Sequence, residues 1–220
     1  MAGPHAKDPG SEVVGVRIIG GTMRGRLLEY SGDPRTRPMK DRVRESVFNL
    51  VGPAIAGAHA IDLFAGTGAL GLEAISRGAT AATLIERHYP SSQLIKQNAQ
   101  SLGIAEKCEV VFGDAFLWGR KPASPAVSNS KSQVSNPKSK IQNLKSAARW
   151  LIFCSPPYEF YVSRQAEMLD LVGTLWSTAP GGSLFVVEAD ERFDFALLPE
   201  PAVWDVRNYR PARIGLAEKS

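Results

Sequence analysis

Cysteine and histidine are scarce in this 220-residue chain, which has two cysteines and three histidines. Cys108 and Cys154 lie far apart in the sequence, so neither a disulfide framework nor a cysteine-based zinc cluster is expected. His5, His59 and His88 show no spacing typical of metal ligands. The sequence therefore predicts no metal site.

Long apolar runs are also missing. No segment approaches the ~18 consecutive apolar residues of a membrane-spanning helix, and the start of the chain lacks the apolar run of a secretory signal. The composition, 44% hydrophobic and 22% charged, is that of a globular protein with one substantial core. We therefore expect a cytoplasmic protein with no membrane partner, and, since nothing in the sequence demands an oligomer, a monomer.

Acidic residues are few in two segments of the chain. Residues 17–44 hold eight Arg/Lys against three acids, and residues 120–149 hold seven Arg/Lys and no acid. Because Lys and Arg replace the counterions of phosphates, this pattern indicates a nucleic-acid contact surface, although a solvated charged face produces it too. The candidate RNA contacts are Arg17, Arg24, Arg26, Arg35, Arg37, Lys40, Arg42 and Arg44.

The chain is expected to have three parts. Residues 1–15 are aperiodic and contain Gly, Pro and Ser, so they are predicted to be a disordered tail. Residues 16–52 combine two apolar runs around a Gly-rich turn, typical of a hairpin, with an amphipathic helix whose basic residues face outward. Residues 53–220 form the core. The apolar stripe of the helix comprises Met39, Val43, Val47 and Leu50.

Strand-like and helical patterns alternate from His59 onward. Five short apolar runs, rich in β-formers, are AHAIDLFA, AATLIE, CEVVF, RWLIFC and SLFVVE. Helical periodicity separates most of them, at 69–77, 90–102 and 162–178, and AVWDVRNY and ARIGLAE indicate a closing antiparallel hairpin. This alternation predicts an α/β fold in which a parallel sheet carries helices on both faces.

The segment 120–148 interrupts this alternation. It repeats N-x-K-S at Asn129, Asn136 and Asn143, but it has one apolar residue per repeat where a coiled coil needs two. Its Ser, Asn and Lys residues cannot bury enough apolar surface to offset the entropy of ordering. We predict a disordered basic insertion, which is either an inert duplication or a flexible arm that contacts RNA.

A Gly-rich turn, IDLFAGTGALGLEA, follows the first core strand and opens a helix. Gly66, Gly68 and Gly71 spell G-x-G-x-x-G, and Glu86 ends the next strand. The pattern fits a dinucleotide, whose pyrophosphate approaches the glycines and whose ribose hydroxyls bind the acid. The same geometry serves S-adenosyl-L-methionine, an adenosine with an aminoacyl tail in place of the pyrophosphate.

Three acidic residues favour the methyl donor. Asp62 lies just before the turn, where a carboxylate neutralises an ammonium but would repel a pyrophosphate. Glu86 can accept hydrogen bonds from both ribose hydroxyls, and Asp114, after the third strand, can meet the adenine amino group. An NAD-dependent oxidoreductase remains the alternative. The candidate cofactor residues are Asp62, Phe64, Ala65, Gly66, Thr67, Gly68, Gly71, Glu86, Arg87, Asp114 and Ala115.

The fourth strand ends in a turn of unusual chemistry, Ser155-Pro156-Pro157-Tyr158. Consecutive prolines fix φ and remove two N–H donors, so the turn exposes acceptors next to an aromatic ring. Such a site suits the exocyclic amino group of a base, and the ring of Tyr158 can stack on a base taken out of its helix. These four residues are the candidate catalytic group, with the Ser155 hydroxyl as an acceptor.

Taken in order, these motifs resemble a known family. RIIGGTMRGRLL, TRPMKDRVRESVFN, DLFAGTGALGLEAISRGA and the P-P-Y turn are similar to RsmD-type bacterial small-subunit rRNA guanine-N2 methyltransferases. The resemblance implies a class I S-adenosylmethionine-dependent methyltransferase fold, a Rossmann-like seven-stranded sheet, with the hairpin and basic helix as an RNA-facing extension. It further implies methyl transfer to a guanine N2 of 16S rRNA, either free or in a small-subunit assembly particle.

Ser155 departs from the family pattern, which usually has Asp at this position. A carboxylate is a stronger acceptor than a hydroxyl, and Ser occurs here in some cytosine-N4 enzymes of the wider group. Three alternatives follow: guanine chemistry with weaker support, an amino group of another base (adenine N6 or cytosine N4), or an RNA-binding relative whose catalysis has decayed.

Overall fold

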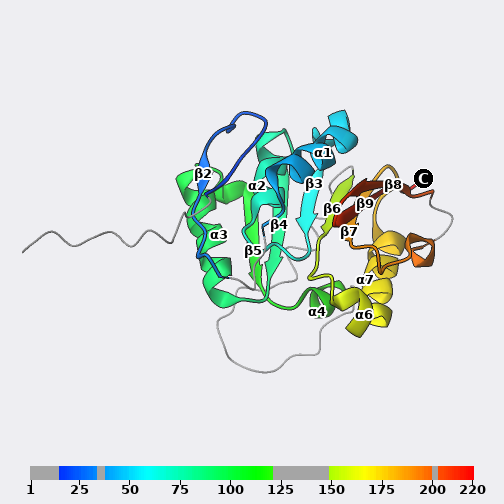
Figure 1. The fold of residues 1–220 in the computed structure, drawn as a ribbon. Helices are drawn as coiled ribbons and strands as arrows, with labels where there is room; N and C mark the ends of the chain where they lie inside the picture. The colour runs from blue at the N-terminus through cyan, green and yellow to red at the C-terminus, as the bar shows by residue number, and fades with distance from the viewer. Residues whose placement is uncertain (1–14, 34–37, 121–148, 200–202) are drawn as a thin grey trace, which may run out of the picture.

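The computed structural model describes residues 15–33, 38–120, 149–199 and 203–220 (Figure 1). The strands are β1 (Val16–Arg17), β2 (Leu27–Leu28), β3 (His59–Asp62), β4 (Ala81–Glu86), β5 (Cys108–Phe112), β6 (Trp150–Cys154), β7 (Leu184–Ala189), β8 (Asp205–Tyr209) and β9 (Ala212–Glu218). The α-helices are α1 (Asp41–Val51), α2 (Ala69–Ser76), α3 (Tyr89–Ser101), α4 (Ala115–Gly119), α6 (Phe160–Ser163) and α7 (Gln165–Thr178). Short 3₁₀ helices lie at Gly52–Ile55, Ala105–Lys107 and Phe195–Leu197.

Seven strands form one sheet in the order β5-β4-β3-β6-β7-β9-β8. The strands from β5 to β7 are parallel, and β9 runs antiparallel to both β7 and β8. The chain reverses its direction of travel across the sheet between β3 and β6. In open α/β sheets, ligands bind outside the carboxyl ends of the strands at such a switch point.

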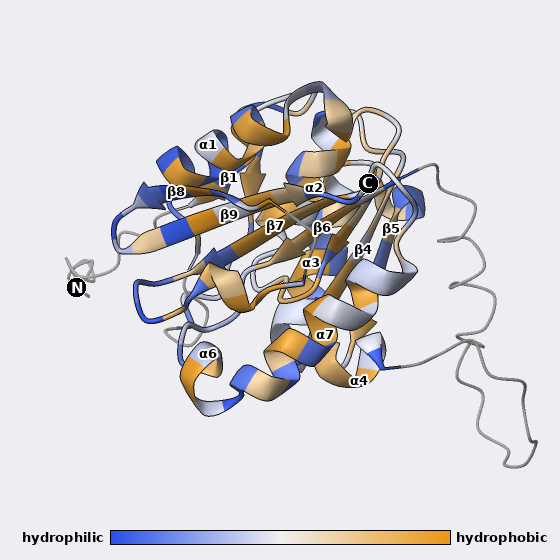
Figure 2. Ribbon diagram, turned by 90° about the vertical axis from the view of Figure 1, so that its right-hand side faces the viewer, coloured by the Kyte–Doolittle hydropathy of each residue, from blue (hydrophilic) through white to orange (hydrophobic). Residues whose placement is uncertain are grey.

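Two apolar cores lie on opposite faces of this sheet. Ala60 and Phe153 belong to the core with α1, α2 and α3, whereas their neighbours Ile61 and Ile152 belong to the core with α4, α6 and α7. Figure 2 shows α1 and α2 above the sheet, α4 and α7 below it, and predominantly hydrophobic central strands. This alternation, with both faces covered, explains why the central strands read as nearly continuous apolar runs.

The N-terminal hairpin packs against the carboxyl end of α2. The Thr22 N–H donates to the Ser76 carbonyl (2.8 Å), and the Ser76 hydroxyl donates to the Gly20 carbonyl (2.7 Å). Gly21 has φ of 80°, and a Cβ there would lie 2.0 Å from the Ser76 carbonyl oxygen. Gly21 thus allows a backbone approach that no larger residue permits.

Arg44 is the exception to the predicted basic outer face of α1. Its side chain is 1% exposed, and its guanidinium lies 3.0 Å from both Glu73 of α2 and Asp41. It also donates to the Arg17 carbonyl. The expectation that Arg44 contacts RNA is therefore wrong, because its charge is buried against a carboxylate of a neighbouring helix and joins the hairpin, α1 and α2.

The predicted core strands and closing hairpin are confirmed. The predicted helix 162–178 is divided at Arg164, whose φ of −133° and ψ of 29° interrupt the helical path between α6 and α7. The short helix α4 lies outside every segment predicted to be helical. Apart from Gly15 and Arg120, the predicted disordered segments 1–15 and 120–148 lie outside the described residues.

None of the helices in the described part of the chain combines the length and the apolar content needed to traverse a bilayer.

Candidate active site

A cavity of about 1020 Å³ lies at the carboxyl ends of the parallel strands. Its wall includes one acidic or hydroxyl side chain from the end of each of four strands or the turn that follows: Glu86 (β4), Asp114 (β5), Ser155 (β6) and Glu188 (β7). The segment before α1 and the turn between β8 and β9 complete it. The volume is at the upper end of the range for small-molecule sites.

The Gly-rich loop is held by the two acids that the sequence singled out. The Gly66 N–H donates to Glu86 (2.8 Å), and the Gly71 N–H donates to Asp62 (3.2 Å). Gly68, the residue just before α2, has the left-handed conformation, with φ of 77°. The loop therefore presents the N-terminus of α2 next to the cavity, with its glycines in conformations and contacts that a side chain would disturb.

Asp62 is buried rather than exposed in the cavity, with a residue exposure of 1%. Its Oδ2 accepts from Gly71, whereas its Oδ1 is buried without a hydrogen-bond partner among the described residues. Burial raises the pKa of Asp62 to about 7; the Gly71 N–H opposes this shift, and the nearby Glu86 carboxylate adds to it. A positively charged ligand group near this buried carboxylate would stabilise its ionised form.

Glu86 and Asp114 both line the cavity. The second oxygen of Glu86 accepts from the His88 N–H (2.7 Å), so the carboxylate is fixed by two backbone amides and each oxygen keeps a lone pair for a hydroxyl. Asp114 caps α4 by accepting from the Phe116 N–H (2.8 Å). Both acids are therefore oriented by the backbone before any ligand binds.

An aromatic cluster, of which the sequence analysis found Phe64 alone, adds apolar surface to the cavity. The rings of Phe64, Phe116 and Phe160 lie 5.7 to 6.1 Å apart, centroid to centroid. The guanidinium of Arg164 lies 3.9 Å from the Phe116 centroid and 3.9 Å from the Asp114 carboxylate. Phe160 and Arg164 also line the cavity, although neither was among the residues that the sequence singled out.

The Ser155–Tyr158 turn converges on a single carboxylate. The Ser155 hydroxyl donates to Glu188 Oε2, and the Tyr158 hydroxyl donates to Glu188 Oε1 (2.7 Å). All four residues of the turn line the cavity. Sequence reasoning missed Glu188, although SLFVVE ends in an acid as AATLIE does, and that shared ending is the signal that could have found it.

The predicted cofactor residues fall into two groups. Phe64, Gly66, Glu86, Arg87, Asp114 and Ala115 line the cavity. Five others do not line it and lie behind it, in the end of β3, the Gly-rich loop and the start of α2: Asp62, Ala65, Thr67, Gly68 and Gly71.

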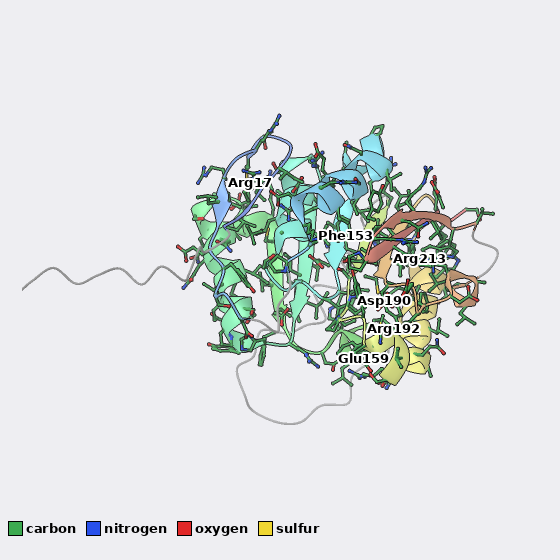
Figure 3. The ribbon with its side chains drawn as sticks, viewed as in Figure 1. Arg17, Phe153, Glu159, Asp190, Arg192 and Arg213 are labelled. Atoms are coloured by element: carbon green, nitrogen blue, oxygen red, sulfur yellow. The ribbon has the colours of Figure 1, made fainter. Side chains whose placement is uncertain are left out.

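The predicted RNA contacts are spread more widely. Lys40 and Arg42 are exposed and line the cavity, whereas Arg24 and Arg26 are exposed on the hairpin. Arg17 pairs with Asp41 at 3.0 Å, and Figure 3 shows it on the hairpin, apart from the labelled Glu159 and Arg192. Arg35 and Arg37 lie outside the described residues.

These features fit S-adenosyl-L-methionine. A buried, unpartnered carboxylate oxygen near the loop matches the positive charges of an aminoacyl sulfonium, and Glu86 matches a ribose diol. The aromatic cluster and Asp114 suit a purine with an exocyclic amino group. A pyrophosphate is negatively charged, so the carboxylates of Glu86 and Asp62 would repel it.

Comparisons with known proteins identify related sequences. A model of the family described as conserved hypothetical protein 95 matches residues 16–130. The chain is 52% identical over 110 residues to ribosomal RNA small subunit methyltransferase D of Escherichia coli K12, covering 50% of this chain and 55% of that protein. It is 33% identical over 155 residues to the protein of that name in Haemophilus influenzae, covering 70% and 69%.

A solved structure is similar over nearly the whole chain. The proposed methyltransferase yhhF from Escherichia coli has a TM-score of 0.72 and 28% identity, covering 94% of this chain and 98% of that one. In sequence, the chain spans about half the length of the first two curated relatives, which are from Bacillus subtilis and Escherichia coli. With its class I fold and a site for S-adenosyl-L-methionine, the cofactor of that class, this chain belongs to the RsmD-type methyltransferase family.

Proposed function

We propose that this protein transfers a methyl group from S-adenosyl-L-methionine to the exocyclic N2 amino group of a guanine in small-subunit rRNA. The observation that carries the proposal is the Ser155–Tyr158 turn, whose acceptors and aromatic ring face the cavity that also contains Glu86 and Asp114. The relatives named ribosomal RNA small subunit methyltransferase D support rRNA as the substrate.

Three acids would hold the cofactor. Glu86 would accept from the ribose hydroxyls, Asp114 would accept from the adenine amino group, and Asp62 would complement the positive charge of the aminoacyl end from behind the loop. When bound, the cofactor supplies an electrophilic methyl group on a sulfonium. The protein then has to orient the amino nitrogen of the base. This nitrogen is a poor nucleophile because its lone pair is delocalised into the ring.

The turn supplies that orientation. The Ser155 oxygen and the Pro156 carbonyl would accept the two amino hydrogens, which draws the nitrogen lone pair out of conjugation with the ring. The ring of Tyr158 would stack on the flipped base. The amino nitrogen would bond to the methyl carbon while the bond from that carbon to sulfur breaks, the electron pair would remain on sulfur, and the nitrogen would release one proton to solvent.

RNA binding is proposed for the exposed basic residues. Lys40 and Arg42 at the cavity would hold phosphates that flank the flipped base, and Arg24 and Arg26 would bind phosphates farther away. These contacts provide affinity and register without reading sequence. The cytoplasm, where the proposed rRNA substrate is found, is the proposed place of action.

Methyl transfer itself tests the proposal. Labelled cofactor is incubated with unmodified small-subunit particles and with naked rRNA, and the RNA is digested to nucleosides. Label in N2-methylguanosine supports the proposal, and the more active substrate distinguishes free RNA from the particle. No label in any nucleoside, with cofactor binding intact, would overturn it.

One feature favours a second candidate, the N4 amino group of cytosine or the N6 amino group of adenine. Ser155 stands where the family usually has Asp, and the turn offers acceptors that any exocyclic amino group could use. The same digestion decides between the candidates, because each product is a different nucleoside.

A further inference from the structure

Glu188 is a buried carboxylate at the edge of the cavity. It lies near the end of β7, is 8% exposed and lines the cavity wall. Both of its oxygens accept hydroxyl protons from the turn after β6, Oε2 from Ser155 and Oε1 from Tyr158. A carboxylate is acceptor-only when ionised, so each hydroxyl must donate to it.

The turn does not depend on Glu188 alone for its position. The Phe160 N–H donates to the Pro157 carbonyl (2.9 Å), which closes the turn. Glu159 pairs with Arg192 (3.1 Å), and Arg192 pairs with Asp190 (2.9 Å) just beyond β7. Figure 3 shows these three labelled side chains together at this end of the molecule. Because these contacts already hold the turn, the two hydrogen bonds of Glu188 can serve a purpose other than fixing the backbone.

That role follows from the chemistry of a serine hydroxyl. A hydroxyl has one proton and two lone pairs, and a free rotor can turn its proton toward an incoming amino group and repel it. Because Ser155 donates its proton to Glu188, only lone pairs remain to face the cavity. The charge behind the hydroxyl also polarises it, since charge-assisted bonds in a chain strengthen one another.

We propose that Glu188 is a positioning residue that makes Ser155 an obligate acceptor for the amino group of the base. Ser155 and Glu188 together then supply the negative acceptor that a single Asp supplies in the usual family pattern. This inference rests on the proposed function, because it assigns a residue to that same site, and it holds for any of the three amino groups considered above.

Four variants test it: Glu188→Gln, Ser155→Asp, the double variant, and Glu191→Gln as the matched control. Glu191 is exposed and lies three residues beyond Glu188, so the control removes the same charge without touching the turn. The Gln amide at position 188 can donate to the Ser155 oxygen and turn its proton toward the base. We expect Glu188→Gln to lower kcat about 10- to 100-fold, less than the loss of a direct electrostatic partner.

The readouts separate positioning from structure. For Glu188→Gln we expect the KM for RNA, the affinity for S-adenosyl-L-methionine and the unfolding midpoint to stay near wild type. Ser155→Asp is expected to raise activity in the Glu188→Gln background, because the carboxylate then acts directly. In the wild-type background the same substitution places two carboxylates side by side and is expected to lower activity.

Each remaining outcome is decisive. A wild-type protein that methylates no RNA overturns the proposed function, and this inference with it. An active wild type with an equally active Glu188→Gln variant overturns this inference alone. A Glu188→Gln variant that loses cofactor affinity and thermal stability along with kcat, without rescue by Ser155→Asp, shows a merely structural residue and also overturns it.

Discussion

Replacing Asp62 by Asn is predicted to stabilise the cofactor-free protein at alkaline pH. The side chain is buried with one unpartnered oxygen, and burial raises the pKa of Asp62 from 3.8 to about 7. A carboxyl whose pKa is higher in the folded state binds protons preferentially in that state. Its contribution to the free energy of unfolding therefore falls as pH rises through the window between the two pKa values.

The magnitude follows from the width of that window. At about 1.4 kcal/mol per pKa unit, ionising Asp62 costs the folded state on the order of 4 kcal/mol at high pH. Between about pH 5 and about pH 8, the carboxyl alone lowers stability by roughly 2 to 3 kcal/mol. The Asn amide does not titrate, and its oxygen can still accept from the Gly71 N–H.

Urea unfolding of wild type and Asp62→Asn at these two pH values measures the effect. The stability advantage of the variant should grow by roughly 2 to 3 kcal/mol from the lower to the higher pH. Glu191→Gln, which removes an exposed carboxylate, controls for the loss of one negative charge. A pH-independent difference between wild type and Asp62→Asn, or a variant less stable at the higher pH, would refute the reasoning.

Three further predictions concern the extension and its basic residues. Glu73→Gln leaves the Arg44 guanidinium with a single carboxylate partner, Asp41, and is expected to cost about 3 kcal/mol or more in chemical denaturation; a loss below 1 kcal/mol would contradict the buried pairing. Charge reversal of Arg24 and Arg26 should weaken RNA binding in a salt-dependent manner while calorimetry gives unchanged cofactor affinity; an equal loss of both would indicate damaged folding. Gly21→Ala should lower the unfolding temperature by several degrees, because its Cβ has no space against α2; an unchanged midpoint would argue against that close contact.

The strands were predictable because both faces of the central sheet are covered, which imposes apolar runs that stand out in the sequence. Asp62, Glu86 and Asp114 could be found from the sequence because each lies at or just after the carboxyl end of a parallel strand. Those strand ends all meet at the same edge of the sheet. Glu188 has the same placement but lacked a motif to attract attention, and its partners Ser155 and Tyr158 are about thirty residues away in sequence. Side-chain pairing between strands is a property of the folded sheet.

Arg44 illustrates a different limit. Its position on the helical surface next to the apolar stripe is compatible with solvent or with a buried ion pair. The choice depends on Glu73, which α2 places 3.0 Å away and fully buries. Helical periodicity describes one element at a time and contains no information about the charge that a packed neighbour presents.

Helix α2 connects two regions that have been described separately. The Gly-rich loop leads directly into its first turn. Its last residue, Ser76, accepts and donates the hydrogen bonds that hold the N-terminal hairpin. Eight helical residues form a stiff rod about 12 Å long, and its middle is anchored by the buried Glu73. The hairpin and the Gly-rich loop are therefore held at a fixed spacing by the two ends of one short helix.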